Sequence, residues 1–343
     1  MSEMMKALLQ TNDGFADRPS PMQLEGLDPY VELAETPVPV PGEGQVLIKV
    51  KLASVNPADV MFIKGMYGQR REKGKPAGFE GVGEVVASGG GAYADSLKGK
   101  RIAFIATHSG AWADYALADA AVCIPLRDDI RDADGAAMIV NPLTAHAMFD
   151  IVKKEGEKAF VMSAAASQLC KLIARMAADE GFRPIALVRR DDQIDLLKSH
   201  GAAHVLNVTA PDFARQLAEV LKAEKPRIFL DAVTGKLAGQ VFAAMGRGAR
   251  WIVYGRLDGS DTVIPEPGQL IFMGKRIEGF WLTQWKRQAS MEENMAAAAA
   301  VQARFASGEW KTDVTAIVPL SEAHARLAGE LEKPNGKVFL VPG

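Results

Sequence analysis

Short apolar runs recur between residues 128 and 285, with helical stretches between them. The runs follow one another at roughly 20–25 residues, a spacing that suits a strand, a helix and the next parallel strand. We therefore expect a parallel sheet with helices on both faces. Its strands are predicted at 159–162, 185–188, 204–206, 227–231, 251–254 and 277–282.

The stretch after the first of these runs has a helical pattern. Apolar residues recur there with the period that places side chains on one face of a helix, at Leu169, Leu172, Ile173, Met176 and Ala177. A complete strand–turn–helix–strand unit thus extends from residue 159 to residue 188. It predicts a Rossmann-type, doubly wound α/β domain over residues 128–285.

The first 127 residues have a different pattern. Their short β-rich runs are broken by Pro and Gly, which is typical of a mainly β domain, and lie at 46–52, 83–87, 101–106 and 112–117. Residues 286–343 begin with an alanine-rich helix and end with two β segments, 315–320 and 337–341. We expect 1–127 and 286–343 to form one domain, into which 128–285 is inserted.

The composition limits the classes of partner. The chain has 343 residues, enough for two domains at the usual ~100–200 residues each, and 40 Lys and Arg face 42 Asp and Glu. A net charge of −2 provides no overall field for nucleic acid or an anionic membrane, which favours a small-molecule substrate. With two cysteines, no signal-peptide pattern and no apolar run near ~20 residues, we expect a soluble cytoplasmic protein.

The turn from Ser163 to Cys170 lies where dinucleotide-binding proteins place glycines, which let the backbone approach the pyrophosphate. Here Ala164, Ser167 and Cys170 stand at the expected positions. Main-chain N–H groups at a helix start still point at an anion, and Ser163 or Ser167 could donate further hydrogen bonds. The candidate phosphate contacts are therefore Ser163, Ala164, Ser167 and Gln168; the alternative is a turn that binds no nucleotide.

Two arginines follow the second strand of the inserted domain. An acidic residue there would bond the ribose hydroxyls of NAD, whereas Arg189 and Arg190 suit the 2′-phosphate of NADP. A guanidinium can bind phosphate through two parallel hydrogen bonds. The alternative is a solvated pair balanced by Asp191 and Asp192. The sequence thus predicts NADPH as the cofactor.

Two motifs of the first domain resemble the medium-chain dehydrogenase/reductase superfamily but differ from its zinc enzymes. The motifs are Asn56-Pro57-Ala58-Asp59 and Gly78-Phe79-Glu80. Zinc alcohol dehydrogenases have Cys and His where Asn56 and Phe79 stand, so no soft-ligand set for zinc remains here. The resemblance implies a reductase that works without metal, a structural role for Glu80, and a Rossmann domain inserted into a GroES-like substrate domain.

Further stretches are similar to the zinc-free branch of that superfamily, the mitochondrial-type enoyl thioester reductases and the related NADPH:quinone reductases. These stretches are 63–68, 78–85 and 279–285. The resemblance implies that NADPH reduces a carbonyl-conjugated C=C bond of an enoyl thioester or enone. A quinone reductase is the alternative, and the altered glycine turn leaves a non-catalytic NADPH-binding relative as a third possibility.

The resemblance also implies roles for single residues. Tyr67 matches the tyrosine that acts as proton or hydrogen-bond donor in the enoyl reductases, unless it is a loop residue half covering the cleft. Asn56 would orient Tyr67 or the nicotinamide ribose, unless Asn-Pro is only turn chemistry here. The other implied cofactor contacts are Thr144, Asp231, Gly255, Phe280 and Trp281.

The segment after the last expected strand contains Trp281 and Trp285. These side chains would line an acyl pocket or pack in a core or dimer interface, since large aromatic residues usually serve burial first. Relatives of this branch pair the edges of their cofactor sheets, and an apolar edge needs to be covered. We therefore expect a homodimer formed partly through residues 277–282.

Overall fold

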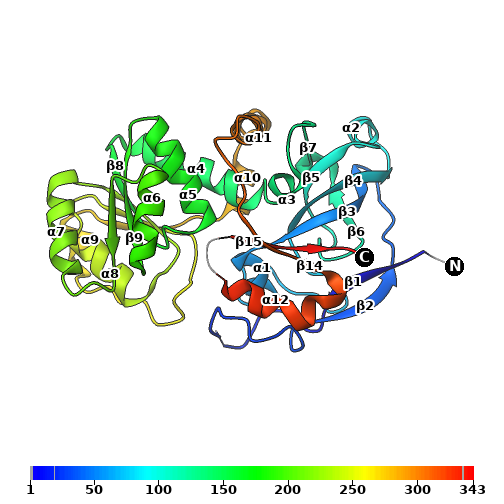
Figure 1. Cartoon of the computed structure of the whole chain (residues 1–343), viewed down its shortest axis with the longest axis horizontal. Helices are drawn as coiled ribbons and strands as arrows, with labels where there is room; N and C mark the ends of the chain where they lie inside the picture. The colour runs from blue at the N-terminus through cyan, green and yellow to red at the C-terminus, as the bar shows by residue number, and fades with distance from the viewer. Residues whose placement is uncertain (1–2, 19, 334–335) are drawn as a thin grey trace. The chain divides into compact units, whose positions relative to one another are not determined.

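The computed structural model describes residues 3–18, 20–333 and 336–343, which fall into two compact units (Figure 1). One unit, termed the terminal unit, combines residues 1–141 with 298–343; the other, termed the central unit, contains residues 142–297. The central unit is therefore inserted into the terminal unit along the chain.

Each change of unit falls inside a helix, α4 (Val140–Glu155) and α11 (Met291–Ala306), and lies C-terminal to the expected boundaries. Because the helical pattern of residues continues across each of these points, the sequence pattern does not reveal the boundary between the units. Over the described ranges, no helix combines the length and apolar character needed to cross a membrane.

The central unit is built on a six-stranded parallel sheet in the order β10-β9-β8-β11-β12-β13. Its strands are β8 (Ala159–Met162), β9 (Arg183–Val188), β10 (His204–Asn207), β11 (Ile228–Asp231), β12 (Arg250–Val253) and β13 (Arg276–Gly279). If the six strands are numbered along the chain from β8, their order in the sheet is 3-2-1-4-5-6, the order of dinucleotide-binding folds. The chain winds outward in one direction from strand 1 and in the other from strand 4. The predicted doubly wound parallel sheet is confirmed, and its switch point lies between β8 and β11.

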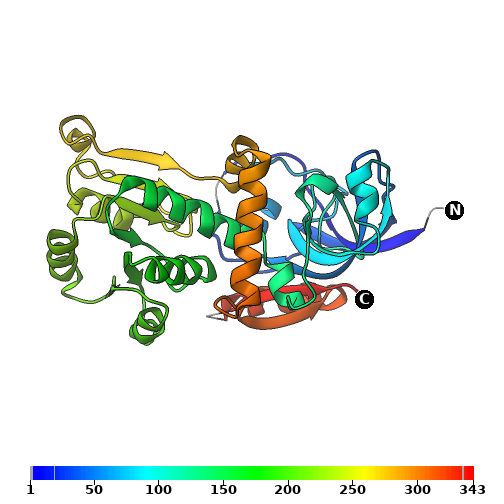
Figure 2. The same cartoon turned by 90° about the horizontal axis from the view of Figure 1, so that it is seen from above.

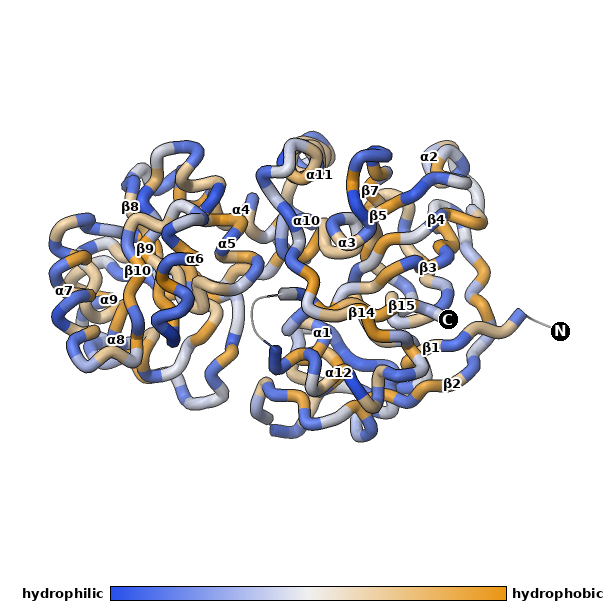
Figure 3. Tube along the Cα trace, viewed as in Figure 1, coloured by the Kyte–Doolittle hydropathy of each residue, from blue (hydrophilic) through white to orange (hydrophobic). Residues whose placement is uncertain are grey.

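Helices connect these strands because parallel neighbours need a crossover. They are α5 (Gln168–Asp179), α6 (Ile194–Ser199), α7 (Phe213–Glu224), α8 (Gly235–Ala244) and α9 (Gly268–Phe272), with α10 (Leu282–Gln288) after the last strand. The predicted apolar face of α5 is buried, and so are β8 and β11 over their whole length. In Figure 3, hydrophobic colour accordingly gathers along the strands of this sheet, while blue predominates in many of the connecting loops.

The terminal unit contains a seven-stranded sheet whose path is β14-β15-β3-β4-β5-β7, with β6 paired to β3, and a separate β1-β2 hairpin. The strands are β1 (Met4–Gln10), β2 (Val31–Pro37), β3 (Gln45–Val55), β4 (Glu80–Ser88), β5 (Arg101–Ile105), β6 (Tyr115–Asp119), β7 (Ile124–Pro125), β14 (Val314–Pro319) and β15 (Lys337–Val341). The short helices are α1 (Pro57–Ile63), α2 (Ala92–Ser96), α3 (Asp132–Ala136) and α12 (Ala323–Glu332). The predicted mainly β domain is confirmed, and β3 pairs with β15 from the other end of the chain, as Figures 1 and 2 show.

Some elements differ from the sequence expectation. The strand expected at 277–282 ends at Gly279: the N–H of Phe280 makes the last contact with β12, at Val253 O (2.8 Å), and Leu282 already begins α10. The strand expected from residue 112 begins at Tyr115. The helix α12 and the β1-β2 hairpin lie in stretches for which no element was predicted.

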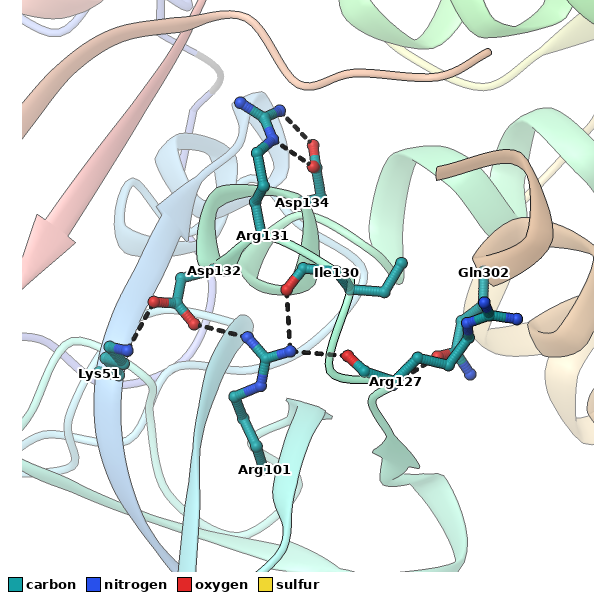
Figure 4. A network of polar contacts seen from close by, with 8 residues as sticks. All are labelled: Lys51, Arg101, Arg127, Ile130, Arg131, Asp132, Asp134 and Gln302. Carbon is teal, nitrogen blue, oxygen red and sulfur yellow. Dashed lines mark hydrogen bonds and ion pairs between the residues drawn. The ribbon is translucent and has the colours of Figure 1, made fainter. Parts of the chain in front are cut away.

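A polar network fixes the segment of the terminal unit between β7 and α3 (Figure 4). Arg101 Nη2 donates to the main-chain oxygens of Arg127 (2.7 Å) and Ile130 (2.8 Å), and its Nη1 donates to Asp132 Oδ1 (2.9 Å). The other oxygen of Asp132 pairs with Lys51 at 2.6 Å. Because Asp132 is the first residue of α3, these bonds anchor the start of that helix to β3 and β5.

Candidate functional site

The switch point of the central sheet is a tight turn after β8. The N–H of Ser163 donates to Leu230 O (3.0 Å) and the N–H of Ala165 donates to Leu187 O (3.1 Å), so the turn is tied to the strands on both sides. Ala164 between them has φ +45°, in the left-handed region that costs a non-glycine residue about 1–2 kcal/mol. The backbone therefore has a conformation suited to glycine although alanine occupies it.

Ser163 and Asp231 link the two strands of the switch point. The Ser163 hydroxyl donates to Asp231 Oδ1 and accepts from the N–H of Ala232 (3.0 Å). Asp231 Oδ2 also accepts from Trp251 Nε1 (2.9 Å), and both carboxylate oxygens accept from main-chain N–H groups just after Ala232. Since both side chains are buried and bonded internally, the main chain of the turn is the better candidate for a phosphate contact.

The first turn of α5 holds the two remaining substitutions for glycine. Ser167 is exposed and caps the helix, accepting from the N–H of Cys170 at 3.3 Å. Gln168, the first residue of the helix, is half-buried. Cys170 is buried with Sγ 3.2 Å from Tyr254 Oη, and burial raises the pKa of its thiol, which favours an unreactive group.

Gly255 lies at the carboxyl end of the neighbouring strand β12. A Cβ added to it would lie 2.9 Å from Ala232 O, closer than side chains approach a carbonyl oxygen. Glycine is therefore required here by the close approach of the segments that follow β11 and β12.

The two arginines after β9 are both exposed but differ in their contacts. Arg190 Nε pairs with Asp192 Oδ1 at 3.0 Å, as the alternative of an internally balanced pair requires. Arg189 makes no such pair with any described residue. Arg189 is thus the better candidate for the 2′-phosphate.

The other candidate cofactor contacts lie on different elements of the central unit. Thr144 is buried near the start of α4. Phe280 and Trp281 are half-buried between β13 and α10 and follow the carboxyl end of a strand, as Ser163 does. Their roles, like those of the other cofactor contacts, stay predictions.

In the terminal unit, Asn56 lies at the centre of a buried polar cluster. Its side chain is 1% exposed; Nδ2 donates to Ser54 Oγ (3.0 Å) and Glu80 Oε1 (2.9 Å), and Oδ1 accepts from Lys337 Nζ. Its main-chain N–H donates to Asp59 Oδ2 at 2.7 Å, which closes the start of α1. With its amide engaged in this way, Asn56 is better suited to holding its neighbours in place than to touching a substrate.

Glu80 is satisfied within the same cluster. Oε1 accepts from Ser54 Oγ (2.8 Å) as well as from Asn56, and Oε2 accepts from the N–H groups of Ile139 (3.1 Å) and Val140 (2.8 Å). The last two bonds place a carboxylate at the N-terminus of α4, where negative charge is stabilised. These four bonds support the structural role expected for Glu80.

The cluster buries the carboxyl groups of Asp59 and Glu80 and the ammonium group of Lys337, and burial is the main cause of the pKa shifts of Asp59 and Lys337. It raises the pKa of Asp59 to about 7; the charge of Glu80 adds to this, while hydrogen bonds from the N–H groups of Asn56 and Phe79 oppose it. Burial also lowers the pKa of Lys337, against the opposing attraction of Glu80 and Asp59. Lys337 is attracted by both carboxyl groups, and its direct hydrogen bond goes to Asn56 Oδ1.

Phe79 stands where the zinc enzymes of the superfamily that the motifs resemble have His, and it belongs to a group of packed aromatic rings. The ring of Phe79 lies 4.9 Å from that of Phe62 and 5.0 Å from that of Tyr67, measured between centroids. Over the residues that the structure describes, no three His, Cys, Asp or Glu side chains come together as metal ligands. Phenylalanine offers no donor atom, and the amide oxygen of Asn56 is already bonded to Lys337.

Tyr67 follows α1 in a half-buried loop whose direction changes at Gly65, where φ is +73°. Its ring packs on Phe79 at an interplanar angle of 43°. Asn56 thus precedes the short helix α1 and Tyr67 follows it. Phe79 packs against Tyr67, and the Phe79 N–H donates to Asp59 (2.8 Å), which also accepts from the N–H of Asn56.

Three members of the cluster were not anticipated from the sequence: Ser54, Trp112 and Lys337. Lys337 is 281 residues from Asn56 and reaches it only because β15 pairs with β3. Trp112 donates from Nε1 to Ser54 O (3.2 Å), and its ring lies so close to Gly78 that a Cβ there would be 2.3 Å away. In the sequence, Lys337 is marked only as a lysine at the start of a β segment, and Trp112 only as a tryptophan after Gly-Ala. Neither signal is specific.

Comparisons with known proteins agree with this geometry. The family described as alcohol dehydrogenase GroES-like domain matches residues 42–128, and the one described as zinc-binding dehydrogenase matches residues 169–300. The mitochondrial enoyl-acyl-carrier-protein reductase of Homo sapiens is 30% identical over 271 residues, covering 77% of this chain and 71% of that protein.

Solved structures show the same relationship. A candidate NADPH:quinone reductase from Mesorhizobium loti has 62% sequence identity and a TM-score of 0.96, over 100% of this chain and 99% of that one. A mycobacterial protein solved in complex with NADPH has 25% identity and a TM-score of 0.81, over 98% and 100%. The chain belongs to the medium-chain dehydrogenase/reductase superfamily, which confirms the resemblance drawn from its motifs.

Proposed function

We propose that this protein is an NADPH-dependent oxidoreductase that reduces the carbonyl-conjugated C=C bond of an enoyl thioester or enone without a metal. The observation that carries the proposal is the chemistry of two motif positions: Asn56, bonded to Lys337, and Phe79 stand where zinc enzymes have ligands, and the ring of Tyr67 packs on Phe79. The relatives named as mitochondrial enoyl-acyl-carrier-protein reductases support the same reaction class.

The cofactor would be held by the central unit at its switch point. Main-chain N–H groups at the start of α5 suit the pyrophosphate, and Arg189 suits the 2′-phosphate. The mycobacterial relative solved with NADPH supports this choice of cofactor. When bound, NADPH supplies a hydride to the β-carbon of the substrate.

The task left to the terminal unit is to stabilise the charge that hydride transfer creates. Negative charge develops on the carbonyl oxygen and α-carbon, and a positioned hydroxyl that donates there lowers the barrier. Tyr67 supplies that hydroxyl in this proposal, with the Phe62 and Phe79 rings as its apolar support. Asn56 acts as a positioning residue through the start of α1.

A quinone reductase is the second candidate, because the relative with 62% identity is named as a candidate NADPH:quinone reductase. Reduction of a flat quinone ring does not need a dedicated donor such as Tyr67. The two functions therefore predict different results for the same substitution.

Tyr67→Phe removes only the hydroxyl and so tests the proposal. A donor of this kind typically contributes ~10²–10³-fold, and we expect that loss in kcat on crotonyl and longer enoyl thioesters, with little change in NADPH affinity. Tyr93→Phe, at an exposed tyrosine on α2, is the matched control and should behave as the unchanged protein. Full turnover of enoyl thioesters by Tyr67→Phe would show that Tyr67 is a wall residue and not the donor. An unchanged protein that is active on quinones but inactive on every enoyl thioester would transfer the assignment to the second candidate.

A homodimer in the cytoplasm is also part of this proposal. The strand β13 is one of the two edge strands of the central sheet, Ile277 on it is 39% exposed, and Ile271 and Phe272 just before it are 75% and 76% exposed. An open strand edge beside apolar side chains is a surface that a second copy can cover. Light scattering at micromolar concentration tests this, and a monomeric mass would contradict it.

A further inference from the structure

Two buried cations flank Tyr67 along the chain. The side chains belong to Lys64, 6% exposed, and Arg71, 8% exposed. Neither forms an ion pair with a carboxylate in the described ranges; their hydrogen bonds go to main-chain oxygens. Burying a charged group without a counter-charge is unfavourable in free energy unless all its donors are bonded. The contacts of these two side chains therefore indicate what they do.

Lys64 joins the end of α1 to an N-terminal segment, residues 13–18 and 20–23, termed here the arm. Its Nζ donates to Pro21 O (2.6 Å) and Gln23 O (2.8 Å) and lies 5.6 Å from the centroid of the Tyr30 ring. Burial lowers the pKa of this ammonium group. One side chain thus fixes two carbonyl groups of the arm against the last turn of the helix.

Arg71 makes the equivalent connection at the other end of the loop. Nε donates to Gly14 O (3.0 Å), Nη2 to Asp13 O (3.3 Å) and Nη1 to Ile63 O (3.2 Å), so one guanidinium joins the arm to α1. A Cβ on Gly65 would lie 2.6 Å from Arg71 Cζ, which shows how closely the loop wraps this group.

Main-chain contacts complete the attachment. Gly14 and Arg71 exchange two backbone hydrogen bonds, at 3.0 and 3.2 Å, and the N–H of Ala16 donates to Gly65 O at 2.9 Å. The N–H of Ser20 contacts Met66 Sδ at 3.2 Å. The loop from Lys64 to Arg71 is therefore fastened to the arm at both ends, and Tyr67 lies between the two attachments.

We propose that Lys64 and Arg71 are positioning residues of the reaction, which hold the Tyr67 hydroxyl in place by fastening its loop to the arm. This inference rests on the proposed function of Tyr67. Lys and Arg are suited to the task because they carry three and five donors, enough to bind several carbonyls at once. A displacement of about 1 Å in a reacting group can cost ~10²-fold in rate, so the attachment matters for turnover.

Arg71→Met and Lys64→Met test the inference on the full-length protein. We expect kcat on crotonyl thioester to fall about 10- to 100-fold for Arg71→Met and less for Lys64→Met, with KM nearly unchanged. NADPH affinity should be unchanged, because the cofactor contacts lie in the central unit. Arg70→Met, at an exposed neighbour in the same loop, is the control and should keep full kcat. Arg71→Lys, which keeps the charge and some of the donors, should recover part of the loss.

A double variant separates this inference from the proposed function. If Arg71 acts through Tyr67, adding Arg71→Met to Tyr67→Phe should lower kcat by less than about threefold, because the positioned hydroxyl is already absent. Losses that multiply fully, or unchanged kcat in both single Met variants, overturn the positioning role and leave the role of Tyr67 standing. If Arg71→Met does not fold, the same comparison is made with Arg71→Lys and with Lys64→Met, each in the natural protein and in Tyr67→Phe. Full activity of Tyr67→Phe alone contradicts the proposed function and this inference together.

Discussion

The cluster around Asn56 and the turn at Ser163 both depart from the pattern of the superfamily, but in different ways. In the cluster the ligand residues are replaced by Asn56 and Phe79, and the amide of Asn56 is bonded to Glu80 and Lys337. In the turn the residues are replaced while the backbone conformation remains, with Ala164 at a positive φ. A site made of donor atoms is lost when those atoms change, whereas a site made of backbone persists as long as the conformation is tolerated.

The largest effect is expected from Lys337→Met, which leaves the carboxyl groups of the cluster without their cation. Removing one partner from a buried charged group costs about 3–5 kcal/mol, so the free energy of unfolding should fall by that order. Denaturant unfolding of the terminal unit measures it. Lys311→Met, at an exposed lysine, is the control. An equally small change in the free energy of unfolding in both variants would show that the carboxyl groups of the cluster do not need the charge of Lys337.

A pH series on Asp59→Asn sharpens the charge balance of the cluster. The pKa of Asp59 is raised to about 7 in the folded protein from 3.8, so the folded state binds a proton that the unfolded state releases. Asp59 therefore contributes stability below about pH 4 that is lost as the pH rises towards 7. Between pH 4 and pH 8 the stability of Asp59→Asn relative to the natural protein should improve by roughly 1–4 kcal/mol. A difference that stays constant with pH would contradict a raised pKa.

For the turn and its cofactor, Arg189→Ala is expected to have a smaller effect. Loss of a guanidinium–phosphate contact should weaken NADPH binding about tenfold, roughly 1.4 kcal/mol, and leave NADH binding unchanged. Titration with both cofactors measures this. Arg190→Ala, which removes a side chain already paired with Asp192, is the matched comparison and should cost less. Equal losses in the two variants would count against Arg189 as the main contact.

The smallest effect is expected from Ala164→Gly. Glycine adopts φ +45° without steric cost but loses more chain entropy on folding, so the net gain should be at most about 1 kcal/mol. Ala164→Val, with a branched Cβ, should destabilise the protein instead. Thermal unfolding of both, with NADPH affinity alongside, decides whether the turn is strained; a loss of stability on Ala164→Gly would show that it is not.

These comparisons also show what the sequence can predict. Periodic patterns predicted the six parallel strands and the buried face of α5, because parallel strands covered on both faces read as continuous apolar runs. The strand at 277–282 was too long because Phe280, Trp281 and Leu282 continue the apolar run into the start of a helix. Periodicity cannot locate that boundary, since Trp281 is still extended (φ −135°, ψ 120°) and the helical conformation begins only at Leu282.

The polar cluster shows the limit of a reading by motifs. The exchange of Cys and His for Asn56 and Phe79 was visible in the sequence, but the group that balances the carboxylates was not. Lys337 enters through the pairing of β15 with β3, a contact between the two ends of the chain. Similarly, the hydroxyl of Ser163 was expected at a phosphate, and nothing local indicated its bond to Asp231 on another strand.

Each of the two regions contains a buried indole that is bonded to it. Trp251 Nε1 donates to Asp231 at the switch point, and Trp112 Nε1 donates to Ser54 O beside Asn56. Indole fluorescence responds to the hydrogen bond and polarity around the ring, so the protein has an intrinsic optical reporter in each place. Variants that retain only Trp112 or only Trp251 of the five tryptophans would let emission spectra follow the opening of the charged cluster and of the cofactor turn separately, without any added label.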